Sequence, residues 1–248
     1  MKKITEHLKA EWYKYFLEIL VITIGILGAF ALNSWNDSKL ERQEEMAVLL
    51  RVKNDLQNTI DEFIFLNGIR DKVLAGTRGL LEVAASNEVD EAQIDSLLSL
   101  TFYRPTFNNK MGAIDLLFAT GKLNIIQSDS IKSKLITWPG SVDDTIEEEA
   151  YAMKVFQDHY TPKLAEYVYV NNAVSKSLGI SFFGGAIKGT DFPAIDIPND
   201  YEGLLNDRAF LNHLRMRASH MQVSNSETVE LVRQTKEIIR LIDKELAR

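Results

Sequence analysis

An apolar stretch near the N-terminus constrains this chain more than any other feature. The residues from Phe16 to Leu32 are apolar or small, and Glu18 is the only charged residue among them. A helix rises about 1.5 Å per residue, so the segment between Trp12 and Trp35 covers roughly the 30 Å hydrocarbon core of a bilayer. The sequence therefore predicts a transmembrane helix over residues 16–35.

Aromatic and amide side chains mark both ends of this segment. Tryptophan and tyrosine concentrate at membrane interfaces, because part of each side chain is apolar and part can reach water. We predict that the interface anchors are Trp12, Tyr15, Asn33, Trp35 and Asn36.

A cleaved secretory signal peptide is the main alternative to a membrane anchor. Lys2 and Lys3 have the character of a basic n-region, and Ala29-Phe30-Ala31 has the small-x-small form of a cleavage site. This site lies inside the apolar run without a polar segment before it, and Glu18 is unusual for a signal sequence. An uncleaved anchor fits the sequence better.

Basic residues predict the orientation of the helix. Four lysines precede the span, whereas only Lys39 and Arg42 follow it closely, and positively charged flanks stay in the cytoplasm. We therefore expect residues 1–15 in the cytoplasm and residues 36–248 outside it as one helical domain. In a bacterium this is a single-pass protein of the inner (cytoplasmic) membrane with a periplasmic domain. The chain has no cysteine, which either compartment permits.

The anchor segment also resembles the opening motif of a known family. The motif reads Glu-Ile, then Gly-Ile-Leu-x-Ala, then Asn-x-Trp-Asn, and its residues here are Glu18, Ile19, Gly25, Ile26, Leu27, Ala29, Asn33, Trp35 and Asn36. A second match comprises Leu116-Leu117, Thr120-Gly121-Lys122-Leu123 and Ile125-Ile126, whereas Leu17 and Ala31 depart from the pattern. The chain thus resembles an uncharacterised, domain-of-unknown-function family of bacterial single-pass membrane proteins. The resemblance implies a membrane-anchored helical domain and no known activity.

Three residues of the predicted span lie on one side of the helix. Glu18, Gly25 and Ala29 are spaced by seven and four positions, and small residues four apart let a second helix approach closely. A carboxylate in a span is costly and is a candidate for function, although Glu18 is near enough to the interface to reach headgroups or to pair with Lys14. We predict that this face packs on a protein partner or on a second copy of the chain.

Helical periodicity continues beyond the span. Apolar residues recur at three- and four-residue steps as a stripe of Met46, Leu49, Val52, Leu56, Ile60, Phe63, Leu66, Ile69 and Val73. No Pro or Gly interrupts the chain from Leu32 to Leu66, so we expect the membrane helix to continue into a long first helix that ends near Ser86. A second long stripe begins near Asp207 and runs to Leu246. The predicted fold class is all-α, a mostly antiparallel helical bundle whose first and last helices are the longest.

Local signals divide the chain between these long helices. Asp90 and Ser128 are predicted to begin helices as N-caps, and Gly121 is predicted to end one in a left-handed conformation. Pro139-Gly140 is expected to kink or break its helix, because proline lacks a backbone N–H and clashes with the preceding turn. Polar residues at Ser224-Asn225-Ser226 interrupt the last stripe and predict either a bend or a stretch outside the bundle.

Residues 171–200 lack helical periodicity and are rich in Gly and Pro. An irregular segment of this length is uncommon inside a compact domain and is often functional. Its centre carries the adjacent rings of Phe182 and Phe183, which we predict as a possible partner-contact loop. The alternative is that the two rings cover the end of the bundle.

Composition and polar residues limit the chemistry. The chain carries 28 basic and 35 acidic residues, a formal net charge of −7, which argues against nucleic acid as a partner because phosphate binding needs a basic surface. His159, His213 and His220 lack the spacing of known zinc motifs and are expected to be packed or solvated. The acidic run from Asp143 to Glu149 is expected to face water.

Basic residues of the last helix complete the candidates. Arg208, Arg215 and Arg217 are expected to pair with carboxylates rather than to hold an anionic ligand. We predict no catalytic residue, no metal ligand and no cofactor. Two function classes stay open: a non-enzymatic, membrane-anchored interaction or assembly module, and an extracytoplasmic ligand sensor or regulator that acts through a partner membrane protein. A hydrolase or metalloenzyme is the third and weakest alternative, since no motif supports it.

Overall fold

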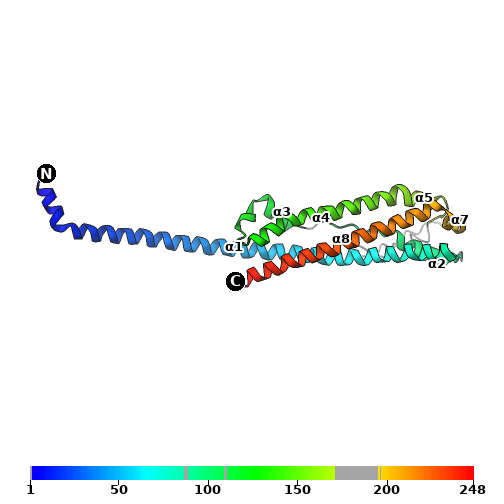
Figure 1. The fold of residues 1–248 in the computed structure, drawn as a ribbon, viewed down its shortest axis with the longest axis horizontal. Helices are drawn as coiled ribbons and strands as arrows, with labels where there is room; N and C mark the ends of the chain where they lie inside the picture. The colour runs from blue at the N-terminus through cyan, green and yellow to red at the C-terminus, as the bar shows by residue number, and fades with distance from the viewer. Residues whose placement is uncertain (1, 87–88, 109–110, 171–194, 196) are drawn as a thin grey trace.

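The computed structural model describes the chain apart from residues 1, 87–88, 109–110, 171–194 and 196, and it describes no side chains for residues 2–11 and 15 (Figure 1). The described residues form helices and no β-strand, so the predicted all-α class is confirmed. The elements are α1 (Lys2–Ser86), α2 (Glu91–Thr101), α3 (Gly112–Ala119), η1 (Lys122–Ile125), α4 (Asp129–Val155), η2 (Phe156–Tyr160), α5 (Thr161–Ala165), α7 (Tyr201–Asn206) and α8 (Arg208–Leu246).

Helix α1 is 85 residues long, which corresponds to roughly 130 Å at 1.5 Å per residue. Its N-terminal part projects alone from the bundle, and its remaining part lies beside α8 and α2 (Figure 1). The C-terminus of α8 lies where α1 enters the bundle, and α2 and α7 lie at the opposite end. The predicted continuation of the first helix to Ser86 is confirmed.

The three long helices alternate in direction. Lys53 pairs with Asp243 and Asp71 accepts a hydrogen bond from Asn225, so numbers rise on α1 as they fall on α8. The same holds between α4 and α8, where Lys134 pairs with Glu237 and Glu148 contacts His220. Helix α8 is therefore antiparallel to both α1 and α4, as the predicted bundle requires.

The predicted stripe of α1 forms the core, with one exception. Leu49, Val52, Leu56, Phe63 and Val73 are fully buried. Met46 is 39% exposed, and Glu45 occupies the buried position instead. Burial of Glu45 is possible because Arg42 pairs with its carboxylate at 2.5 Å and the backbone N–H of Gln127 donates to it at 2.6 Å. The prediction that Met46 belongs to the buried stripe is wrong, because the spacing of apolar residues contains no information about the polar partners of Glu45.

The predicted end signals act as expected. The carboxylate of Asp90 accepts hydrogen bonds from Ala92 and Gln93, and the hydroxyl of Ser128 accepts one from Ile131. Gly121 follows α3 with φ +66°, a conformation that favours glycine because a Cβ would clash there. The chain turns at this residue into η1 and then enters α4.

Pro139 does not break α4, contrary to one of the two predicted outcomes. The helix runs through the proline from Asp129 to Val155. Leu135, Trp138 and Val142 on its buried face pack into the core, and the indole N–H of Trp138 donates to Thr235 on α8. Packing on both sides of the proline keeps the two half-helices together.

A wider turn accommodates the second helical proline of this region, Pro162. The element η2 is a π-helical turn, in which the N–H of Thr161 donates to the carbonyl of Phe156 five residues earlier. Hydrogen bonds in a π turn span one residue more than those in an α-helix. This shift changes which carbonyls need a donor, so the helix accommodates Pro162, which has no backbone N–H. The chain then continues into α5.

Candidate functional sites

The N-terminal part of α1 is the first candidate site. Every described side chain from Trp12 to Glu41 is exposed. Among the described helices, α1 is the one that is long and apolar enough to cross a membrane. Apolar residues that no described part of the chain covers need another apolar environment, which a lipid bilayer or a partner helix supplies.

The predicted packing face is open in the single chain. Glu18, Gly25 and Ala29 are exposed, and a Cβ built on Gly25 meets nothing within 4 Å. The structure thus places the three residues on one uncovered helix side and brings none of them to another element. The packing role of this face stays a prediction.

The predicted interface anchors are also uncovered. Trp12 is 64% exposed and Trp35 is 63% exposed, with the ammonium of Lys39 5.6 Å from the ring centre of Trp35. Asn33 donates to the carboxylate of Asp37 at 2.9 Å, one turn further along, and Asn36 has no covering element. The side chain of Tyr15, like Phe182 and Phe183, lies outside the described residues.

A polar layer inside the bundle is the second candidate site, and sequence reasoning missed it. Arg70 on α1 is fully buried and forms an ion pair with Glu149 on α4. The other carboxylate oxygen of Glu149 accepts the backbone N–H of Phe107 at 2.7 Å. Thr228 on α8 completes the layer, since its hydroxyl lies 3.2 Å from Arg70 and donates to Asn67.

Burial dominates the titration of this layer. Desolvation raises the pKa of Glu149, opposed by the N–H of Phe107 and by the charge of Arg70. Desolvation also lowers the pKa of Arg70, opposed by Glu149. Guanidinium groups remain charged in proteins, so the pair is best described as a compensated internal ion pair. The prediction that the whole acidic run faces water is therefore wrong for Glu149.

The polar residues of α8 at Ser224-Asn225-Ser226 belong to the same level of the bundle. Ser224 is fully buried, and Asn225 donates to Asp71 on α1 at 2.9 Å. Helix α8 passes through this level without ending. The predicted stretch outside the bundle is wrong, because Ser224 is buried and Asn225 contacts α1 at this level.

Arg217 is buried without a carboxylate. It is 5% exposed, its guanidinium lies 4.3 Å from the ring centre of Phe156, and it donates to the carbonyl of Tyr103 at 2.6 Å. Burial lowers the pKa of Arg217 to about 10. The predicted pairing with a carboxylate is wrong, because an aromatic face and a carbonyl take the place of the anion.

The three candidate histidines do not share one set of contacts. The rings of His159 and His213 stack with centres 5.5 Å apart, and burial, together with the charge of His159, lowers the pKa of His213. His220 instead contacts Glu148 at 2.8 Å. Within the described part of the chain, no group of three or more His, Cys, Asp or Glu is arranged to hold a metal ion.

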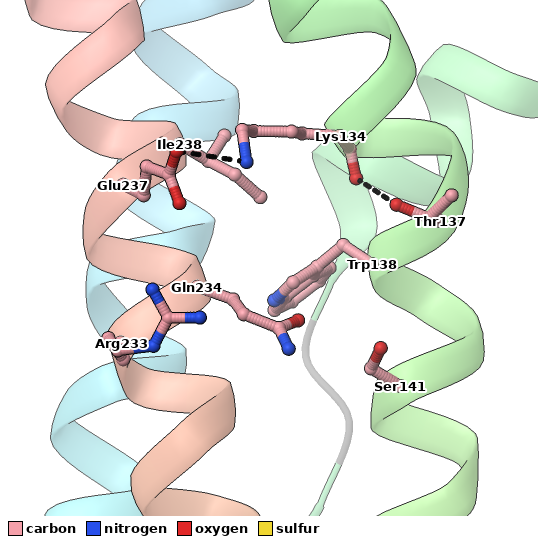
Figure 2. Close-up of a pocket in the computed structure, with 8 residues that line it drawn as sticks. All are labelled: Lys134, Thr137, Trp138, Ser141, Arg233, Gln234, Glu237 and Ile238. Atoms are coloured by element: carbon pink, nitrogen blue, oxygen red, sulfur yellow. Dashed lines mark hydrogen bonds and ion pairs between the residues drawn. The ribbon is translucent and has the colours of Figure 1, made fainter.

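Two surface grooves accompany these features. The groove between α4 and α8 has a volume of about 360 Å³ and is mainly polar (Figure 2). Figure 2 shows the side chains that line it, which come from the two helices: Lys134, Thr137, Trp138, Ser141, Arg233, Gln234, Glu237 and Ile238. Lys134 is paired with Glu237 across the groove at 3.0 Å, and Arg233 is paired with Glu230. Its cations are thus already compensated.

The groove between α1 and α3 has a volume of about 290 Å³ and is mainly apolar. Val48, Leu116 and Leu117 supply apolar lining, and Arg51 and Lys122 supply the charges. This groove adjoins the end of the bundle from which the exposed part of α1 projects (Figure 1).

Comparison of the chain with protein-family models, curated proteins and solved structures gives no significant match. The resemblance of the anchor motif to a family of bacterial membrane proteins stays a prediction. The buried ionisable groups contact one another or aromatic rings, an arrangement typical of structural roles.

Proposed function

We propose that this protein is a membrane-anchored, non-enzymatic interaction or assembly module. Residues 16–35 cross the inner membrane once, residues 1–15 are cytoplasmic, and the bundle is periplasmic. The observation that carries the proposal is the contrast within α1, whose apolar N-terminal part is uncovered and whose remainder packs in the bundle. One unbroken helix would hold the bundle at a fixed distance from the membrane.

The anchor supplies the assembly contact in this proposal. Glu18, Gly25 and Ala29 form the face on which a partner helix or a second copy packs, and Gly25 has open space for a close approach. The side chain of Leu27 lies on the opposite side of the helix, since it is two residues from both Gly25 and Ala29 and two residues advance a helix by about 200°. It provides a matched control.

The test is recovery of complexes from membranes in mild detergent with the intact chain as bait. We expect a stoichiometric partner or a homo-oligomer, and Gly25→Leu is expected to weaken association about tenfold by steric clash, whereas Leu27→Phe on the opposite side leaves it unchanged. An alkaline phosphatase fused to the C-terminus should be active if the bundle is periplasmic. A monomer with both variants like the wild type would contradict the assembly role, and an inactive fusion would contradict the topology.

A ligand sensor is the second candidate, and the continuity of α1 favours it. A ligand that shifts the bundle would move the anchor, because the two share one helix. In this alternative the output passes through a partner membrane protein. A bound small molecule in the recovered complex would favour this candidate.

A further inference from the structure

We propose that the groove between α1 and α3 binds an anionic single-chain amphiphile, such as a free fatty acid. The apolar chain would lie on Val48, Leu116 and Leu117, and the carboxylate would lie at Arg51 and Lys122. This site is separate from the anchor face and does not depend on the assembly contact proposed above.

The lining combines apolar surface with accessible positive charge. Leu117 is 2% exposed and forms a fixed floor, whereas Leu116 is 55% exposed beside it. The volume of about 290 Å³ is at the lower end of small-molecule sites. A hydrocarbon chain bound here would contact Leu116 and the apolar groove. The contact is favourable because the ligand and the protein both lose water-exposed apolar area.

The charges at the groove select an anion. Among the described residues, no carboxylate pairs with Arg51. Lys122 pairs with Glu44 at 2.5 Å, but both side chains are about half exposed, and such surface pairs contribute little and exchange readily. The nearby carboxylate of Asp55 already accepts the backbone N–H of Ala113 at 2.7 Å. A ligand carboxylate therefore meets one free cation and one that is weakly held.

The position of the groove favours a free acid over a lipid that stays in the bilayer. Asn36 marks the proposed membrane edge, and Val48 lies about 18 Å further along the helix axis at 1.5 Å per residue. A diacyl lipid with its chains in the hydrocarbon core does not reach that far. A single-chain amphiphile can leave the membrane or arrive from solution.

The glycine at the start of α3 offers a way to fill the groove. Gly112 lines it, and a Cβ built there meets nothing within 4 Å. Leucine is also a better helix former than glycine, so Gly112→Leu is expected to fold. Gly140 on α4 has equally open space outside this groove, and Gly140→Leu is the matched control.

The experiment uses the full chain in nanodiscs of zwitterionic phospholipid and a decanoic acid that carries a photoreactive diazirine. We expect saturable labelling of peptides from α1 and α3 that excess decanoate displaces and decyltrimethylammonium, a cation of similar chain length, does not. Gly112→Leu is expected to reduce labelling about tenfold and Arg51→Gln several-fold, with Gly140→Leu unchanged. Thermal unfolding of each variant verifies that it is folded.

Several results would overturn the proposal. These are labelling that does not saturate, equal labelling of Gly112→Leu and the wild type, or equal displacement by the cationic competitor. A parallel arm places the diazirine on a phospholipid in the nanodisc. Labelling of the same peptides by that probe alone would assign the groove to a bilayer lipid and contradict a free acid. The monomeric or oligomeric state of the anchor does not alter any of these outcomes.

Discussion

The two parts of α1 face different environments with the same backbone conformation. From Trp12 to Glu41 every described side chain is exposed, whereas from Arg42 to Ser86 a stripe of residues is buried against α2, α4 and α8. Within the first part, residues 16–32 are apolar or small on every side apart from Glu18, whereas the second part is apolar on one side only. The distribution of apolar residues around a helix, rather than its helical propensity, thus decides whether lipid or protein covers it.

The largest expected effect comes from removing a core ring in the second part. Phe63 is fully buried and stacks on Phe107 with ring centres 4.5 Å apart. Phe63→Ala is expected to lower the free energy of unfolding by about 3–5 kcal/mol. Phe30, 68% exposed in the first part, provides the control, and Phe30→Ala should leave bundle stability within about 0.5 kcal/mol. Urea unfolding of the full chain in micelles, followed by circular dichroism, measures both, and equal losses would remove the distinction between the two parts.

The next effect tests a charge inside the bundle. Glu149→Leu leaves Arg70 buried without its partner and is expected to destabilise the bundle by about 3 kcal/mol. The double variant Arg70→Met with Glu149→Leu should recover most of this loss, because apolar residues often replace a buried ion pair without cost. Full recovery is not expected, since the N–H of Phe107 loses its acceptor in both variants. Additive losses in the double variant would show that the two residues act independently.

Sequence patterns predict the helices of this bundle better than its polar layer. The stripe from Leu49 to Val73 and the helix end near Ser86 follow from local periodicity, which needs no knowledge of other helices. Burial of Glu149 depends on Arg70, which lies on α1 far away in the sequence, and on the backbone N–H of Phe107. A glutamate or a serine viewed alone is typical of a solvated surface. Ser224 is fully buried although its hydroxyl has no hydrogen-bond partner among the described residues.

The candidate sites divide in the same way. The long apolar helix was predictable because residues 16–32 are apolar or small apart from Glu18, and such a run has few alternatives in water. The groove between α1 and α3 was not, since its apolar lining comes from residues more than sixty positions apart. Arg51 and Lys122 both line it because η1 brings the chain back to α1 beside Glu44. No local motif contains that information.

A capping carboxylate makes the stability of the bundle depend on pH. Asp207 caps α8 and accepts from Lys163, Tyr167 and the backbone of Phe210, and these contacts, with Lys163 the largest, hold its pKa well below its ordinary value of 3.8. A carboxylate whose folded pKa is lowered stabilises the fold above its unfolded pKa, and this contribution is lost as the pH falls below about 4. Asp207→Asn should therefore flatten the loss of bundle stability between about pH 4 and pH 2. Thermal unfolding across this range measures the slope, and an unchanged slope would contradict the assigned contacts.

The smallest expected effect on stability comes from breaking the link between the two parts. Leu40 is 56% exposed and lies between the proposed membrane edge and the bundle. In Leu40→Pro, the helix loses one backbone hydrogen bond and the ring clashes with the carbonyl four residues earlier, so α1 should kink there. The bundle should unfold within about 0.5 kcal/mol of the wild type, because no core residue changes. Spin labels at residues 32 and 50 would report a single narrow distance in the wild type and a broad distribution in the variant. If the distribution stays narrow, packing rather than helix continuity fixes the bundle relative to the anchor, and a sensor would have to signal through that packing.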